Sequence, residues 1–74
     1  MEQRQLLNFL SVCEEGRITG AAERRHITRQ GLSKSIRDLE DELEVPLFER
    51  SRKGIALTEY GRVMEKAAKA WTGQ

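Results

Sequence analysis

The sequence predicts a mainly α-helical domain that carries one small β-hairpin. The chain has 74 residues, of which 38% are apolar, so it can bury one thin hydrophobic core. Apolar residues recur at helical spacing in four segments. Between the third and fourth segments they alternate, as in short strands. The predicted order is therefore three helices, a hairpin and a fourth helix.

The first helix is predicted from Arg4 to Glu15. Its apolar residues lie at positions i, i+3, i+4 and i+7 of one face: Leu6, Phe9, Leu10 and Cys13. Gly16 follows and supplies the usual end of a helix. We expect this face to enter the core, with Cys13 as a small buried hydrophobe rather than a redox sensor.

Two more helices follow, joined by a short connection at His26 and Ile27. The second helix is predicted over Ile18–Arg25, with Thr19 able to cap it. The third runs from Arg29 to about Leu43, with Thr28 as its N-cap. Its core stripe comprises Leu32, Ile36, Leu39 and Leu43.

The hairpin is predicted from two alternating apolar pairs, Val45 with Leu47 and Ile55 with Leu57. Residues 51–54 form the loop between them. Pro46 suits the start of the first strand, where a missing N–H does least harm. Two helices joined by a tight turn and followed by a hairpin describe a winged helix-turn-helix, whose third helix is the candidate reader of a DNA groove.

A fourth helix is predicted to begin after Thr58, with an apolar face of Tyr60, Val63, Met64, Ala67 and Trp71. A core of this size cannot cover the whole stripe. We therefore expect a dimer contact through Val63, Met64, Ala67 and Trp71, although a frayed, exposed end is the alternative for Trp71. The chain then divides into a winged helix-turn-helix, 1–57, and the start of a dimerisation helix, 58–74.

Charge is arranged in blocks, although the net charge is only +1. Residues 24–37 contain basic residues and no acid, residues 38–49 contain acids and no base, and residues 50–53 are basic again. The face of the third helix opposite its core stripe is polar and basic, with Gln30, Ser33, Lys34 and Arg37. Such groups reach base edges and phosphates in a major groove.

The candidates for phosphate neutralisation share a positive charge: Arg24, Arg25, Lys34, Arg37, Arg52 and Lys53. Arg52 and Lys53, at the hairpin tip, could contact an adjacent minor groove or the DNA backbone. The simpler alternative is a solvated surface, on which Lys34–Asp38 and Arg37–Asp41 form ordinary ion pairs one helical turn apart.

Composition argues against several other classes of protein. One Cys and one His exclude a disulfide framework and a Cys-rich zinc site. No catalytic set can be assembled around His26 alone, so we expect no catalytic residue, no metal, no cofactor and no enzyme activity. No apolar run approaches the roughly 20 residues of a membrane span, and no signal sequence is visible, so we expect a cytoplasmic protein.

Four stretches, in this order and spacing, resemble the N-terminal DNA-binding domain of LysR-type bacterial transcriptional regulators: RQLLNFLSVCEEG, AAERRHIT, LSKSIRDLEDELEVPLFER and ALTEYG. The match covers roughly residues 3–66. The resemblance implies a winged helix-turn-helix, a linker helix that pairs two subunits, and a C-terminal domain that senses a small-molecule effector. We expect that domain to be missing here and the chain to stop inside the linker helix.

The resemblance also implies contacts with double-stranded DNA from the start of the third helix and from the wing: Thr28, Arg29, Gln30, Ser33, Lys34, Arg52 and Lys53. Thr19 matches a frequent phosphate contact. Arg29 stands where the family usually has Gln, which alters the residues that read bases. Glu44 stands where it usually has Gly, so a left-handed backbone there would strain this residue by roughly 1 kcal/mol.

The sequence therefore predicts a sequence-specific, double-stranded DNA-binding module of a bacterial transcription regulator. In this hypothesis the third helix enters the major groove and two copies read a dyad. The alternative is a winged helix for protein–protein contact without DNA binding, against which the basic stretch 24–37 argues. A single-domain DNA binder that is complete at 74 residues is a weaker alternative.

Overall fold

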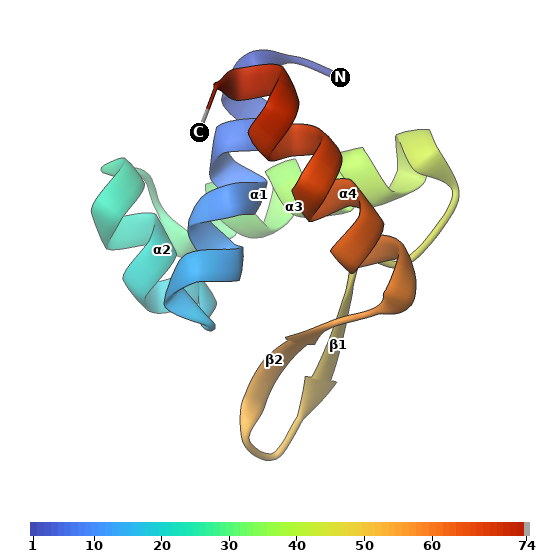
Figure 1. Ribbon diagram of the computed structural model, residues 1–74. Coiled ribbons are helices and arrows are strands. Elements are labelled where there is room, and N and C mark those ends of the chain that lie inside the picture. Colours follow the sequence, from blue (N-terminus) through green and yellow to red (C-terminus); the bar gives the residue numbers. More distant parts are fainter. Residues whose placement is uncertain (74) are drawn as a thin grey trace.

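The computed structural model describes residues 1–73, which form four helices and a two-stranded antiparallel sheet. The elements are α1 (Gln3–Glu15), α2 (Ile18–Arg25), α3 (Arg29–Leu43), β1 (Phe48–Ser51), β2 (Gly54–Leu57) and α4 (Glu59–Thr72). The helices form one body, from which the hairpin projects as a wing (Figure 1). The predicted winged helix-turn-helix is confirmed.

Side-chain caps define the starts of α3 and α4. The hydroxyls of Thr28 and Thr58 accept hydrogen bonds from the backbone N–H of Gly31 and Gly61, at 2.9 and 3.0 Å. The Thr28 N-cap and the start of a helix after Thr58 were both predicted from sequence. The predicted cap of α2 at Thr19 is wrong, because the N-cap is Arg17 and makes no side-chain cap bond. Thr19 lies inside the first turn of α2 instead.

Two helices end in a left-handed residue at the positions that the sequence singled out. Gly16 follows α1 with a φ of 74°, a conformation that glycine adopts freely. Glu44 follows α3 with a φ of 59°, where a side chain carries strain. His26 ends α2 in the same conformation, so the connection between α2 and α3 is one tight turn.

The core lies around α1, which packs against α2, α3 and α4. Its predicted face is buried at Leu6, Phe9 and Leu10. The ring centroids of Phe9 and of Phe48, at the root of the wing, lie 5.3 Å apart. Val12 is also fully buried, although it lies off the predicted stripe. The reason is that α1 is covered on more than one side, which a single-stripe pattern does not show.

The hairpin begins later in the chain than the sequence predicted. Phe48–Ser51 pairs with Gly54–Leu57, and the loop is the two residues Arg52 and Lys53. The predicted first strand at Val45–Leu47 is wrong. Leu47 is fully buried, and its carbonyl accepts a hydrogen bond from the Thr58 N–H at 3.0 Å. The alternation of Val45 and Leu47 therefore marks burial beside α4 rather than strand pairing.

The predicted apolar face of α4 is divided between the core and solvent. Met64 is half-buried against the core, whereas Val63 and Trp71 are 71% and 73% exposed. Ala67 is exposed as well. At Gly61 the helix touches the wing root so closely that a Cβ would meet the Leu47 carbonyl oxygen.

Within residues 1–73, no helix is both long enough and apolar enough to cross a membrane.

Candidate nucleic-acid interface

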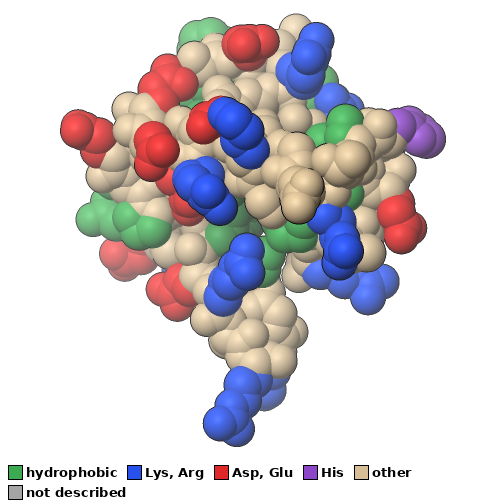
Figure 2. Space-filling view, turned by 180° about the vertical axis from the view of Figure 1, so that it is seen from behind, with side chains coloured by type: hydrophobic (Ala, Val, Ile, Leu, Met, Phe, Trp, Pro, Cys, Tyr) green, Lys and Arg blue, Asp and Glu red, His purple; other side chains and the backbone are tan. Residues whose placement is uncertain are grey.

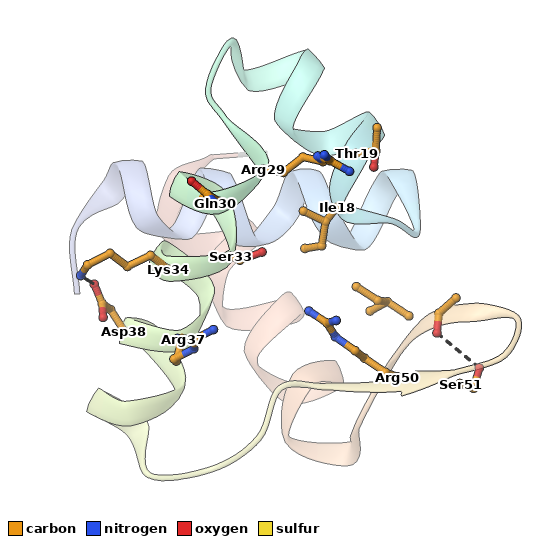
Figure 3. Close-up of a pocket in the computed structure, with 12 residues that line it drawn as sticks. Ile18, Thr19, Arg29, Gln30, Ser33, Lys34, Arg37, Asp38, Arg50 and Ser51 are labelled. Atoms are coloured by element: carbon orange, nitrogen blue, oxygen red, sulfur yellow. Dashed lines mark hydrogen bonds and ion pairs between the residues drawn. The ribbon is translucent and has the colours of Figure 1, made fainter.

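An open groove lies between the N-terminal half of α3, the start of α2 and the wing (Figure 3). Helix α3 presents Arg29, Gln30, Ser33, Lys34 and Arg37 to it. These residues share one face because α3 buries Leu32, Ile36 and Leu39 on its opposite side. The groove is therefore a direct consequence of the amphipathic pattern of α3.

Six of the nine residues predicted to contact DNA line this groove: Thr19, Arg29, Gln30, Ser33, Lys34 and Arg37. Thr28 does not line it, because its hydroxyl caps α3. Arg52 and Lys53 form the loop at the far end of the hairpin and are exposed. The structure thus brings the helix residues together and holds the two wing-tip cations apart from them.

Sequence reasoning missed the opposite wall of the groove. The wing supplies Arg50 and Ser51 of β1 and Gly54 and Ile55 of β2, and the rest of the lining is Ile18 of α2 and Asp38 of α3. Arg50 extends from the wing toward Ile18 (Figure 3). The basic run 50–53 carried the signal for Arg50, but strand register was needed to show which of its cations turns toward α3.

The ion pairs of the described chain leave three guanidinium groups of the groove without a carboxylate partner. They belong to Arg29, Arg37 and Arg50, and none of the ion pairs among residues 1–73 includes them. The predicted Lys34–Asp38 pair forms, at 2.8 Å, whereas the predicted Arg37–Asp41 pair does not. Both Lys34 and Asp38 are at least half exposed, so water screens this pair strongly.

The acidic block of α3 is turned away from the groove, apart from Asp38. One Glu40 carboxylate oxygen accepts hydrogen bonds from the backbone N–H of Leu47 and Phe48, at 2.7 and 3.3 Å. Glu42 pairs with the N-terminal ammonium at 2.8 Å. Figure 2 shows the result, with Lys and Arg side chains around the hollow and at the wing tip, and most of the acids of this view on the left.

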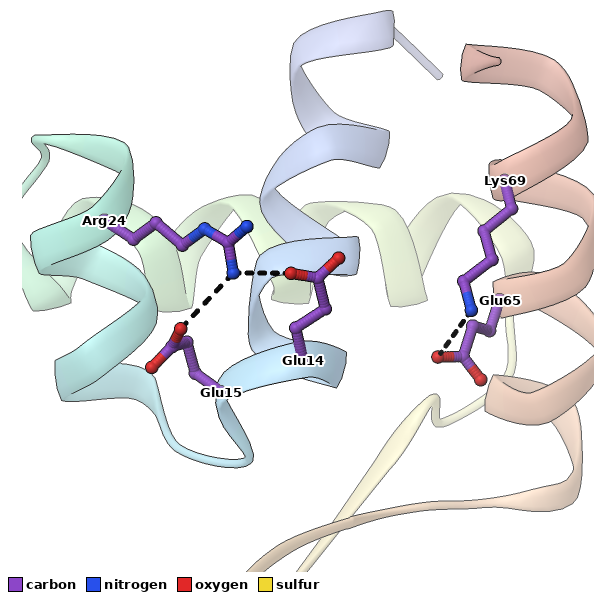
Figure 4. A network of polar contacts seen from close by, with 5 residues as sticks. All are labelled: Glu14, Glu15, Arg24, Glu65 and Lys69. Atoms are coloured by element: carbon purple, nitrogen blue, oxygen red, sulfur yellow. Dashed lines mark hydrogen bonds and ion pairs between the residues drawn. The ribbon is translucent and has the colours of Figure 1, made fainter. Parts of the chain in front are cut away.

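Two other predicted phosphate contacts face α1 instead. Arg24 forms ion pairs with Glu14 and Glu15, which tie the end of α2 to the end of α1 (Figure 4). Arg25 donates from Nε to the Asn8 side-chain oxygen at 2.8 Å. Neither residue lines the groove. The basic block 24–37 is therefore divided between holding the helices together and lining the groove.

The environment of Cys13 raises the pKa of its thiol. The side chain is half-buried between α1 and α4, and burial, together with the charge of Glu65, raises the pKa of Cys13 to about 12. Lys69, which lies 3.8 Å from Glu65 (Figure 4), opposes this shift. The thiol therefore stays protonated near neutral pH.

Residues 1–73 also hold no cluster of His, Cys, Asp and Glu that could ligate a metal ion.

Comparison with known proteins adds a family to this geometry. Residues 3–62 match the family model described as bacterial regulatory helix-turn-helix protein, lysR family. The HTH-type transcriptional regulator ClcR of Pseudomonas putida is 48% identical over 61 residues, which are 82% of this chain and 21% of ClcR. BsdA of Bacillus subtilis is 43% identical over 93% of the chain and 24% of BsdA. The chain thus spans about a fifth of the length of ClcR.

Solved structures with this fold include complexes with DNA. The CbnR_DBD–DNA complex superposes with a TM-score of 0.91 at 38% identity, over 96% of this chain and 82% of that one. The complex of BenM_DBD with catB site 1 DNA gives a TM-score of 0.94 at 34% identity, over 99% and 82%. The groove described above therefore belongs to a fold that is solved with DNA bound.

Proposed function

The chain belongs to the LysR family of bacterial helix-turn-helix regulatory proteins, and we propose that it binds double-stranded DNA in a sequence-dependent way through the groove face of α3. The family is one of transcription regulators rather than of enzymes. In this proposal the N-terminal half of α3 enters the major groove, where Gln30, Ser33 and Lys34 can reach base edges. Such a role places the protein in the bacterial cytoplasm.

The observation that carries the proposal is the set of three arginines in the groove. Arg29, Arg37 and Arg50 approach one open space from α3 and β1, and no carboxylate of residues 1–73 neutralises them. Cations held on one face without partners attract a polyanion, and neutralised phosphates release counterions. Among residues 1–73, Asp38 is the one acid that lines the groove, and it is paired with Lys34. The complexes of CbnR_DBD and BenM_DBD with DNA support this assignment.

The wing extends the proposed contact along the duplex. Arg52 and Lys53 lie at the tip of a hairpin that projects from the body beside α3 (Figure 1). When an α-helix lies in the major groove, which is about 12 Å wide, a hairpin that projects beside the helix reaches past the groove. It can then contact the neighbouring backbone or minor groove. We assign Arg50 to the same surface as a phosphate contact.

The alternative, a winged helix that contacts only proteins, makes the opposite prediction for DNA. The test is retardation of a random duplex at low salt by the wild type and by three single variants, Arg37→Ala, Arg50→Ala and Arg24→Ala. Each variant loses one positive charge. We expect the first two to bind more weakly and Arg24→Ala to match the wild type, because Arg24 is paired on the far side of α2. Absence of binding by the wild type would favour the alternative.

We also propose that two copies associate through α4. Val63, Ala67 and Trp71 recur at helical spacing on its exposed side, and Met64 lies at the edge of the same stripe. An exposed apolar stripe on a small domain is typical of an interface with another chain. A homodimer would present two copies of α3 to a two-fold symmetric site.

The resemblance further implies a small-molecule effector. We assign its recognition to sequence outside these 74 residues, because the chain spans only about a fifth of ClcR.

A further inference from the structure

A chain of hydrogen bonds runs through the helical body behind the groove. The Nε of Arg25, at the end of α2, donates to the side-chain oxygen of Asn8 at 2.8 Å. The amide nitrogen of Asn8, in α1, donates to the Ser35 hydroxyl of α3 at 3.2 Å. Gln5 donates to the Ser35 carbonyl at 3.2 Å. Four side chains therefore connect α1, α2 and α3.

The centre of this hydrogen-bond network is buried, so its donors and acceptors must be matched closely. Asn8 is only 5% exposed, and a buried amide without partners costs free energy. Both ends of its amide are bonded, and no buried side-chain nitrogen or oxygen among residues 1–73 lacks a partner. An apolar residue could fill the same space. A fully bonded amide instead fixes directions, because its donor and acceptor must each meet a particular atom.

The position of Ser35 connects this network to the groove. Ser35 directly follows Lys34 and is two residues from Ser33, and both of those residues line the groove. Holding Ser35 from the α1 side therefore restrains rotation of α3 about its own axis. Residues that recognise a ligand need to be held within about 0.5 Å and 10–20° of their working geometry by hydrogen bonds behind them.

We propose that Asn8, with Arg25 and Ser35, positions α3 so that its groove face meets the base edges in register. This inference rests on the proposed DNA binding. These residues act through α3 and need not touch DNA themselves. A purely structural network would support stability alone. A network that positions α3 also sets the difference between the affinity for a preferred site and the affinity for an arbitrary duplex.

The test measures that difference in affinity. A preferred duplex is first selected from a random library with the wild type, and affinities for it and for a scrambled duplex are then compared. Ser35→Ala removes the hydroxyl and suits a helix. We expect its ratio of selected to scrambled affinity to fall about fivefold, the equivalent of one lost hydrogen bond, while affinity for the scrambled duplex is retained.

Asn8 variants separate hydrogen bonding from packing. Asn8→Leu keeps the branched shape of the side chain and removes both bonds, so we expect the ratio to fall further. Asn8→Asp keeps the acceptor for Arg25 and can accept a hydrogen bond from the Ser35 hydroxyl, so we expect it to retain most of the ratio. Ser11→Ala is the control, because Ser11 is a buried hydroxyl of α1 outside the network. All affinities are measured below the onset of thermal unfolding, followed by circular dichroism.

Two results would overturn the inference. One is that the folded variants Ser35→Ala and Asn8→Leu keep the wild-type ratio of selected to scrambled affinity. The other is an equal loss of affinity for both duplexes. If Asn8→Leu does not fold, Ser35→Ala decides alone. If the wild type itself does not prefer the selected duplex, the proposed function fails, and that outcome is separate from failure of the positioning role.

Discussion

Glu44 has the left-handed backbone conformation for which the sequence analysis expected strain. It ends α3 with a φ of 59°, where glycine carries no Cβ penalty. Glu44→Gly should therefore raise the free energy of unfolding by about 1 kcal/mol. Glu44→Gln is the matched control, because it removes the charge and keeps the strain. Urea unfolding of the three proteins measures the difference, and a glycine variant no more stable than the glutamine variant would contradict the account.

Arg29 carries the sharpest prediction about specificity. It stands in the first turn of α3 and lines the groove, with its guanidinium on the side of Thr19 (Figure 3). Arginine offers two donors to the O6 and N7 acceptors of guanine, whereas glutamine suits adenine. We expect a guanine in each selected half-site.

Arg29→Gln should then relax or switch that position, at a cost of about 1–3 kcal/mol on the original site. Competition binding against duplexes changed at that base pair provides the measurement. A uniform loss over all duplexes would show that Arg29 only contacts the backbone.

At the scale of elements, the wing should contribute charge rather than base reading. Lys53 is exposed in the two-residue loop between β1 and β2. Lys53→Ala should make the slope of log affinity against log salt shallower by about 0.9, the value for one neutralised phosphate, and weaken all sequences similarly. Lys66→Ala, on α4 and outside the groove lining, is the control of equal charge. An unchanged slope in Lys53→Ala would remove the wing tip from the interface.

Helix α4 should hold a weak dimer. Trp71 is 73% exposed and lies on the same side as Val63 and Ala67, so pairing of two α4 helices would bury it. Sedimentation across concentration should show self-association of the wild type that weakens in Trp71→Ala. Ile27→Ala, which also truncates an exposed apolar residue but lies between α2 and α3, should leave it unchanged. A wild type that stays monomeric at the highest usable concentration would refute this contact.

The helices were predictable because each signals itself locally. Thr28 and Thr58 are caps, and the stripe of α3 fixes its buried side and hence its groove face. The start of the wing was not predictable in this way. Val45 and Leu47 alternate as a strand does, but the residues that pair are set by contacts with α3 and α4: Glu40 binds the amides of Leu47 and Phe48, and Thr58 binds the Leu47 carbonyl.

The basic residues of the candidate site show the same limit of prediction from sequence. Arg24, Arg25 and Arg50 are indistinguishable as charges in the sequence. In the fold, Arg24 binds two glutamates, Arg25 binds a buried amide, and Arg50 lines the groove. Each partner is distant in the chain or lies across an element, so only the packing of the helices decides which cations remain available for DNA.

At the scale of the whole molecule, separate regions take separate tasks. The net charge is only +1, yet the groove and the wing tip are basic and the end of α3 is acidic. Such a distribution orients the molecule on a polyanion more than it raises bulk attraction. Asn8 of α1 is hydrogen-bonded to both α2 and α3, and the exposed apolar stripe of α4 is where we propose that a second copy binds.

In vitro selection of bound duplexes from a random library shows directly whether the groove face of α3 reads double-stranded DNA. We expect enrichment of one motif with a guanine in each half-site. We also expect the wild type to bind this motif at least about tenfold more tightly than a scrambled duplex at physiological salt. A library that shows no enrichment after repeated rounds, with equal binding of all duplexes or none, would contradict both expectations.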